Sequence, residues 1–396
     1  MSHRAVAIVI AGFFTAFIAF AIRYSYGLLL PEMLPALAIS KTEAGIIFSS
    51  YFITATLLSP VLGLLVDRSD ARILISTFVA MLGIGTYLMS FSSSVIQASI
   101  FFCLAGIGHS ACWAPVVTVV MRWVSEKRRG IVLAFVDLGS TAGIAVCSIT
   151  IPLMTGAYSW RTVWVSLGIF AFIVAAMNFF MIKSHPPFEP GPGGSGTAPR
   201  APIPIRVAYM AIIRDKKFYL IGLSYLLLSF SILVPLTFLT TFATQELKIP
   251  YQSAAGLLAV FAVVGAAAKL FLSHLSDVVG RVRVMMFCGV LTAIGGLGLA
   301  YVHAFLLLVL FTAVFGAGYG TIWPVFAAAA RDFFPKEYAG SVVGLWTVFH
   351  GLGSIMSPVI AGWTIDGTGA YVWAFILAMI SSIISILLLF PMAKTK

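Results

Sequence analysis

Long apolar runs recur along the whole chain and are separated by short polar or charged stretches. A helix needs about 20 apolar residues to cross the hydrocarbon core of a membrane. The runs are much longer than the roughly ten alternating residues of a barrel strand. They predict an all-α membrane protein with twelve spanning helices, near residues 6–30, 43–66, 73–92, 95–121, 130–154, 162–182, 218–243, 252–276, 284–302, 304–330, 339–363 and 371–391.

The composition agrees with this pattern, because 61% of the residues are hydrophobic and only 9% are charged. Soluble domains carry about a quarter charged residues, so a soluble fold is excluded. The first run follows His3 and Arg4, as a signal peptide would, but it is too long and has no convincing cleavage site before Arg23. We expect an uncleaved first helix.

The net charge of +11 follows the membrane topology and does not indicate nucleic-acid binding. With twelve spans, one set of loops holds only Lys41, Arg161 and Lys248. The other set holds Arg4, Arg68, Arg72, Arg122, Lys127, Arg128, Arg129, Lys183, Arg206, Arg214, Lys216, Lys217, Arg281, Arg283, Arg331, Lys336, Lys394 and Lys396. Loops rich in Lys and Arg usually stay in the cytoplasm. Both termini and the central loop belong to the basic set, so they are predicted to be cytoplasmic. By analogy, the compact loops favour a bacterial cytoplasmic membrane.

The chain divides into two similar halves. Residues 184–204 are rich in Pro and Gly and predict a flexible connection. We therefore expect an N-terminal six-helix bundle at 1–183, a cytoplasmic linker at 184–216 and a C-terminal six-helix bundle at 217–396. A shift of 210 residues aligns uncommon residues of the halves without a gap. It pairs Asp67 with Asp277, Gly106 with Gly316, Gly108 with Gly318, Trp113 with Trp323, Gly130 with Gly340 and Gly143 with Gly353.

A charged loop motif occurs in both halves. The loop after the second span reads Gly63-Leu-Leu-Val-Asp67-Arg68-Ser-Asp70-Ala71-Arg72, and its counterpart reads Ser273-His-Leu-Ser-Asp277-Val-Val-Gly280-Arg281-Val-Arg283. Both resemble the signature G-x-x-x-D-R-x-G-R-[KR] of the major facilitator superfamily. The resemblance implies two pseudo-symmetric bundles around a central site, with alternating access. It also implies a gating motif, for which loop anchoring is an equal alternative, at Gly63, Asp67, Arg68, Arg72, Asp277, Gly280 and Arg281.

A few ionisable residues fall inside the predicted spans, where each is a functional-site hypothesis. Lys269 lies about 12 Å from the end of the eighth span, and Arg23 lies at a similar depth in the first. Two cations without an equal number of buried acids predict a cavity that binds an anion. His109, Asp137 and His350 are the other candidates.

The pattern Lys269-x-x-x-Ser273-x-x-x-Asp277 resembles the eighth span of monocarboxylate and oxalate:formate carriers, which usually have Arg in place of Lys269. In those families the cation binds the substrate carboxylate. The stretch from Arg23 to Tyr26 resembles their first span, and His350 lies where the oxalate branch carries a cation. Asp137, His109 and His350 are candidates for proton coupling. For Asp137, pairing with helix ends is an equal alternative.

Two aromatic pairs are related by the 210-residue shift. His109 and Trp113 share one face of the fourth span, and Tyr319 and Trp323 share one face of the tenth. These faces either line the cavity or pack helices together. The expected substrate-binding residues are Lys269, Arg23, Tyr26, His109, Trp113, Tyr319, Trp323 and His350.

The sequence therefore predicts a secondary transporter of a small organic anion, a mono- or dicarboxylate, working by proton symport or anion exchange as a monomer. The alternatives are a proton-coupled exporter of drugs or other amphipathic compounds and a membrane sensor that does not transport. We expect no enzyme, because no nucleophile constellation or phosphate motif is present. No cofactor or metal is expected, since Cys103, Cys112, Cys147 and Cys288 have no paired loop spacing.

Overall fold

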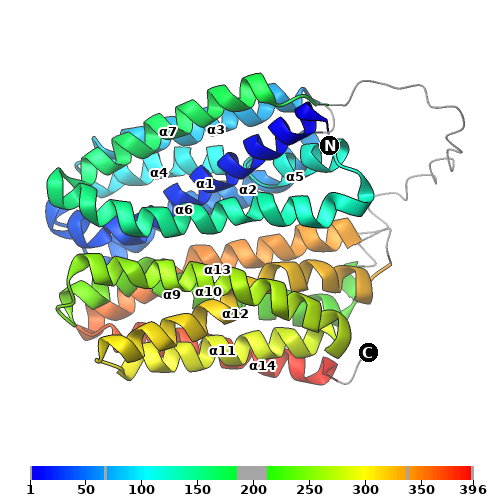
Figure 1. Cartoon of the computed structure of the whole chain (residues 1–396). Helices are drawn as coiled ribbons and strands as arrows, with labels where there is room; N and C mark the ends of the chain where they lie inside the picture. Colours follow the sequence, from blue (N-terminus) through cyan, green and yellow to red (C-terminus); the bar gives the residue numbers. More distant parts are fainter. Residues whose placement is uncertain (1, 67–68, 185–211, 336–338, 394–396) are drawn as a thin grey trace, which may run out of the picture.

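The structure is a computed structural model that describes residues 2–66, 69–184, 212–335 and 339–393. The described residues contain twelve helical spans that are long and apolar enough to cross a membrane (Figure 1). The prediction of an all-α membrane protein with twelve spans in two six-helix bundles is confirmed. Of the predicted linker at 184–216, residues 185–211 lie outside the described part.

The helices follow the predicted runs closely, except that the first helix continues past residue 30 to Leu37 and the eleventh span continues past residue 363 to Thr368. The N-terminal bundle contains α1 His3–Leu37, α2 Lys41–Leu65, α3 Ala71–Met89, α4 Val95–His109, α5 Ala114–Trp123, α6 Arg129–Ala157 and α7 Trp160–Met181, with a 3₁₀ turn at Glu126–Arg128. The C-terminal bundle contains α9 Lys216–Gln245, α10 Tyr251–Val279, α11 Arg281–Tyr301, α12 Phe305–Phe333, α13 Ala339–Thr368 and α14 Val372–Leu389, with a 3₁₀ turn at Phe390–Met392.

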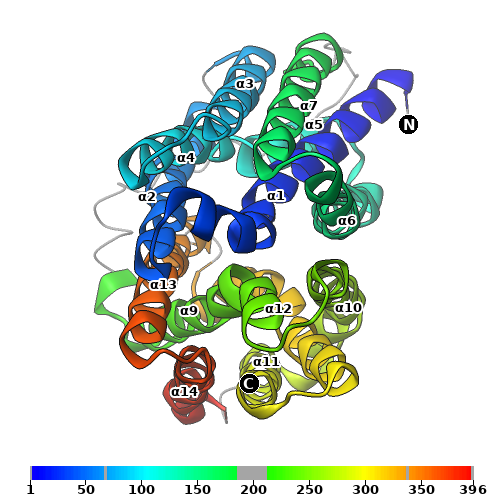
Figure 2. The ribbon, with the colours of Figure 1, turned by 90° about the vertical axis from the view of Figure 1, so that its left-hand side faces the viewer.

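The two bundles lie side by side with their helices roughly parallel (Figures 1 and 2). Both chain ends lie at one end of the molecule, which we call the terminal side (Figure 1). The opposite end, where α1 connects to α2 and α13 to α14, is the far side. The innermost helices are α1 and α9, because each is buried over most of its length between its own bundle and the other one.

Polar residues at the loops fix where several helices begin. Ser40 and Glu43 form a reciprocal capping box at the start of α2. Ser159 caps α7 by accepting a hydrogen bond from the backbone of Thr162. The helix limits are thus encoded by short polar stretches between apolar runs, as the sequence indicates.

The fourth span is broken, although the sequence predicts one continuous run at 95–121. It consists of α4 and α5, which are joined by a turn at residues 110–113. Pro115 lies at the start of α5 and has no N–H to continue the helix. Its ring also conflicts with the carbonyl four residues earlier. The break lies between His109 and Trp113, two of the predicted site residues.

On the far side the bundles are in backbone contact at glycines. Gly27 of α1 lies against the carbonyl of Leu236 in α9, and Gly45 of α2 lies against that of Pro358 in α13. A Cβ atom at either glycine would overlap the opposing backbone, so only glycine allows this approach. We call these contacts the far-side seal.

A carboxylate completes the far-side seal. Asp366, near the end of α13, accepts hydrogen bonds from the backbone N–H of Thr42 at 2.8 Å and of Lys41 at 3.1 Å. The Thr42 hydroxyl also donates to it, at 2.6 Å. The first N–H groups of a helix have no partners within the helix and favour a negative charge. Asp366 therefore ties the C-terminal bundle to the start of α2.

Candidate functional site

A cavity of about 220 Å³ lies between the bundles, lined by helices of both. It has aromatic, aliphatic and charged walls, as small-molecule sites commonly do. It contains the intramembrane charges that the sequence singled out. Its lining includes Phe20, Arg23, Tyr24, Tyr51, Phe52, Thr56, Ser59, His109, Trp113, Asp137, Ser140, Tyr225, Ile232, Leu233, Lys269, Tyr319, Ile322, Trp323, Thr347 and His350.

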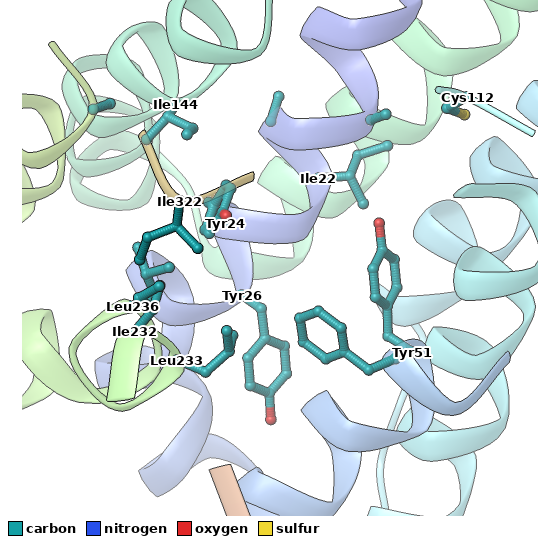
Figure 3. Close-up of a cluster of buried hydrophobic side chains, with 14 of the residues drawn as sticks. Ile22, Tyr24, Tyr26, Tyr51, Cys112, Ile144, Ile232, Leu233, Leu236 and Ile322 are labelled. Atoms are coloured by element: carbon teal, nitrogen blue, oxygen red, sulfur yellow. The ribbon is translucent and has the colours of Figure 1, made fainter. Parts of the chain in front are cut away.

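Tyr26 is the expected binding residue that the structure places elsewhere. Its ring stacks on Phe48 and Phe102, at 4.8 and 5.1 Å between ring centroids, and its hydroxyl donates to the Ala44 carbonyl at 2.7 Å. Figure 3 shows this hydroxyl pointing away from that of Tyr51. The helix period explains the difference, because Phe20, Arg23 and Tyr24 form the cavity-facing stripe of α1 and Tyr26 lies just beside it.

Lys269 and Asp137 form an ion pair across the cavity, with 2.5 Å between Nζ and Oδ2. Lys269 belongs to α10 and Asp137 to α6, so the pair joins the two bundles. About a quarter of each side chain is exposed. The sequence singled out both residues separately, and the structure makes each the counter-charge of the other.

Arg23 has no acidic partner among the described residues. Its guanidinium lies over the ring of Phe52 at 4.5 Å and near the rings of Tyr24 and Phe20 at 5.3 and 5.8 Å. Its Nε is buried and has no hydrogen-bond partner. Aromatic faces partly stabilise the cation, but they leave its hydrogen-bond donors unused. The three charged side chains of the cavity thus carry one net positive charge.

Two further contacts join the bundles at the cavity. The rings of Trp113 and Trp323 meet edge to face, with centroids 5.9 Å apart and planes at 90°. The hydroxyls of Tyr24 and Tyr319 are hydrogen-bonded at 2.9 Å. Trp113 and Trp323 are related by the 210-residue shift, so these two symmetry-related residues touch each other between the bundles.

The histidines lie in the cavity wall among aromatic rings. The His109 ring lies 5.8 Å from that of Phe20 and 5.3 Å from that of Tyr51. The His350 ring lies 4.9 Å from that of Tyr225. Both histidines are therefore placed where a bound molecule could reach them.

The second copy of the charged motif joins three helix ends on the terminal side. Arg281, at the start of α11, is ion-paired with Asp277 of α10 and with Asp332 of α12, the latter at 3.1 Å. It also donates to the Ser276 hydroxyl at 2.5 Å. Gly280 precedes it with φ of 105°, a backbone conformation that residues other than glycine rarely adopt.

The first copy is described only in part. Asp67 and Arg68 lie outside the described residues, and Gly63 lies within α2. Asp70, where the signature has Gly, caps α3 by accepting from the Arg72 backbone at 2.9 Å. Ser184 donates to the same carboxylate at 2.8 Å. The Ser184 hydrogen bond is the main cause that holds the pKa of Asp70 below its ordinary value.

Sequence reasoning missed several cavity residues, notably Tyr24, Tyr51 and Phe52. Tyr24 follows Arg23 directly and lies four residues after Phe20, so the helix period around Arg23 was an available signal. Tyr51 and Phe52 lie in an apolar stretch of α2 with no charge to mark them. Only the packing of α2 between α4 and α13 of the other bundle brings them to the site.

The arrangement of the helices around a central cavity agrees with the comparisons to known proteins. The family model described as Major Facilitator Superfamily matches residues 12–267 and 221–396. Monocarboxylate transporter 12-B of Danio rerio is 24% identical over 371 residues, which cover 86% of this chain and 76% of the relative. The hexuronate transporter of Bacillus subtilis is 22% identical over 363 residues, covering 86% and 83%. The D-galactonate transporter of Escherichia coli O6:H1 is 22% identical over 408 residues, covering 95% and 93%.

Solved structures share the fold. The nucleoside transporter NupG superimposes with a TM-score of 0.77 at 14% identity, covering 100% of both chains. A bacterial homologue of the human lysosomal transporter Spinster, inward-facing and unoccupied, gives a TM-score of 0.76 at 15% identity, covering 99% of this chain and 96% of that one. Both likenesses concern the arrangement of the helices.

Proposed function

The chain belongs to the major facilitator superfamily, and from that premise we propose that it is a secondary transporter of a small carboxylate anion. The observation that carries the proposal is Arg23, a partly buried cation in the cavity wall without an acidic partner in the described part of the chain. A carboxylate would supply the missing charge and accept hydrogen bonds from the guanidinium. An exporter of cationic drugs would need an excess of acids in the cavity instead.

The ion pair of Lys269 and Asp137 offers a route to coupling. A substrate carboxylate that bonds to Lys269 competes with Asp137 for the same ammonium group. Asp137 is then left without its counter-charge and offers a carboxylate to which a proton can bind. Proton symport would follow if this proton travels with the anion, and anion exchange if the pair re-forms without one. His109 and His350 are the alternative proton carriers.

The names of the relatives support an acidic substrate. Monocarboxylate, hexuronate and D-galactonate transporters are all named for acids. We place the terminal side in the cytoplasm, because it holds the basic loops, and we infer a monomer in a bacterial cytoplasmic membrane. The far-side seal would then close the outer face, so that the cavity is reached from the cytoplasm in this conformation.

The test is a thermal-stability screen of detergent-purified protein against small carboxylates, sulfonates, neutral sugars and cationic drugs. A ligand at 100 times its dissociation constant stabilises the folded state by about 2.7 kcal/mol, which a melting curve resolves. We expect carboxylates to raise the Tm of the wild type and of Arg129→Ala, a control at a partly exposed arginine that is paired with Glu126 and does not line the cavity. Arg23→Ala should abolish the effect.

Uptake into proteoliposomes then separates transport from sensing. A carboxylate that binds without being taken up would support the sensor alternative. If cationic or neutral compounds stabilise wild type and Arg23→Ala equally while carboxylates do nothing, the anion proposal fails. The exporter alternative would then take its place.

A further inference from the structure

The charges of the cavity are distributed unequally over the two halves of the chain. The 210-residue shift relates each charged cavity residue to an uncharged one: Arg23 to Leu233, Asp137 to Thr347 and Lys269 to Ser59. All six residues line the cavity. Both halves form six spans, so the fold alone does not require a charge at any of these positions. Charges inside a membrane are costly, and their presence at only one of each two related positions indicates a role in the site.

The contact between α2 and α13 shows how the bundles pack where these charges are replaced by hydroxyls. Ser59 belongs to α2 and Thr347 to α13, two helices that pack against each other across the bundles. Each hydroxyl donates to a carbonyl of its own helix, Ser59 to that of Ala55 at 2.6 Å and Thr347 to that of Val343 at 2.8 Å. The related contact, between α6 and α10, carries the ion pair instead. Packing of the bundles therefore does not in general require an ion pair.

The ion pair fixes the charge that a ligand has to neutralise. About a quarter of the side chains of Asp137 and Lys269 is exposed, so a molecule in the cavity can reach both. Their charges cancel, and Arg23 adds one positive charge. Without Asp137 the same cavity would carry two positive charges. Asp137 thus halves the negative charge that the site requires from a ligand.

We propose that Asp137 limits the substrate to a single carboxylate by taking the place of a second one. The inference rests on the proposed function and names the charge of its substrate, a monocarboxylate. One substrate carboxylate neutralises the cavity, whether it bonds to Arg23 or displaces Asp137 from Lys269. A second carboxylate would give the cavity an excess of negative charge and would meet Asp137 as a like charge. Asp137 is therefore a specificity-determining residue that acts by repelling the wrong substrate.

Like charges brought together in a partly buried site weaken binding strongly. We expect the wild type to bind a monocarboxylate at least about tenfold more tightly than a dicarboxylate of the same chain length. Removal of the Asp137 charge leaves Arg23 and Lys269 both without an acid, and the two ends of a dicarboxylate can then neutralise both. The preference should reverse.

The experiment is a melting titration of purified full-length protein with butyrate and succinate. Both have four carbons, and they differ in that one end is a methyl group or a second carboxylate. At about pH 7.5 both carboxyl groups of succinate are ionised. Asp137→Asn, which keeps the size of the side chain, should shift the ratio of affinities toward succinate by at least about tenfold. Glu126→Gln removes an exposed acid that does not line the cavity, and it should keep the wild-type ratio.

Two further variants test the cause. Asp137→Asn/Lys269→Met also removes the cation that would hold the second carboxylate, so the gain in succinate binding should disappear. Asp137→Thr copies the residue at the symmetry-related position 347 and should give the same shift toward succinate, should Asp137→Asn fail to fold.

The outcomes separate this inference from the proposed function. Tighter binding of succinate than of butyrate by the wild type would overturn the inference and would leave the carboxylate proposal standing. An equal change in the affinity for both acids in Asp137→Asn, or a gain for succinate that persists without Lys269, would also overturn it. Failure of every carboxylate to stabilise the wild type would reject the proposed function itself.

Discussion

At the scale of single residues, the stabilising effect of the Lys269–Asp137 ion pair can be tested directly, because removing either charge leaves the other without its partner. Asp137→Ala leaves a partly buried ammonium group without its partner and should lower the free energy of unfolding by about 2 kcal/mol. The double variant Asp137→Ala/Lys269→Ala should recover much of that loss. Thermal unfolding of wild type, both single variants and the double variant measures the coupling. Additive losses would show that the two charges do not interact.

A second residue-scale prediction concerns pH. The hydrogen bonds from Ser184 and Arg72 hold the pKa of Asp70 below its ordinary value. Its folded-state pKa is therefore below that of the unfolded chain, about 3.9. The resulting stabilisation is present above that pH and is lost as the pH falls through the folded-state pKa. Asp70→Asn should lower the Tm by about 1–2 °C at pH 7, and by progressively less as the pH falls below the unfolded-state pKa of about 3.9. A loss that stays the same as the pH is lowered through this range would contradict this cause.

The depth of single charged residues in the membrane could be predicted from the sequence, but their interaction partners could not. Counting residues from the loops placed Lys269 and Arg23 well inside their spans, and both line the cavity. Pairing of Lys269 with Asp137 depends on the contact between α10 and α6, which belong to different bundles. Tyr26 was predicted from the resemblance of the stretch that begins at Arg23 to the first span of carboxylate carriers, whereas its direction depends on the helix period and on the rings of Phe48 and Phe102.

At the scale of helices, the glycines of the far-side seal make a sharp prediction. Gly45→Leu should separate α2 from α13, because its side chain would overlap the Pro358 backbone. A cysteine introduced at Thr42 should then react faster with a membrane-impermeant maleimide added from the far side. Gly256→Leu is the matched control, since a Cβ there meets no atom within 4 Å. Equal labelling with both leucines would show that the seal does not depend on Gly45.

Helix positions were predictable because apolar runs and polar loops fix them locally, whereas the break in the fourth span was missed. Membrane helices often tolerate proline, so Pro115 alone did not reveal it. The symmetry-related helix α12 contains Pro324 and remains continuous from Phe305 to Phe333. The different outcome at similar positions shows that tertiary packing decides whether a proline breaks a span.

At the scale of the whole molecule, alternating access requires the far-side seal to open. Cysteines at positions 42 and 366 replace two side chains that are hydrogen-bonded at 2.6 Å, so a short bifunctional thiol reagent should join them. The cross-link should stop carboxylate uptake in proteoliposomes, and reduction of a cleavable linker should restore it. Each single cysteine with the same reagent is the control. Undiminished uptake by the cross-linked protein would exclude opening at this point.

The two-bundle architecture was predictable because the 210-residue repeat and the superfamily signature both encode it. Which side is closed was not predictable. A transporter has at least two conformations of similar free energy, and both are compatible with one sequence. The contacts of Gly27, Gly45 and Asp366 show that the far side is closed here, and no sequence pattern marks those residues as a set.

The unequal walls of the cavity have a stereochemical consequence. Two copies with identical walls would present the same surface on both sides, and a bound acid would have two equivalent orientations. Leu233, the counterpart of Arg23 under the 210-residue shift, also lines the cavity and removes that equivalence. An acid whose carboxylate bonds to Arg23 would then meet different side chains in the two bundles, so the two mirror images of a chiral acid would make different contacts. The D and L forms of a chiral carboxylate should therefore differ in affinity in the thermal-stability screen.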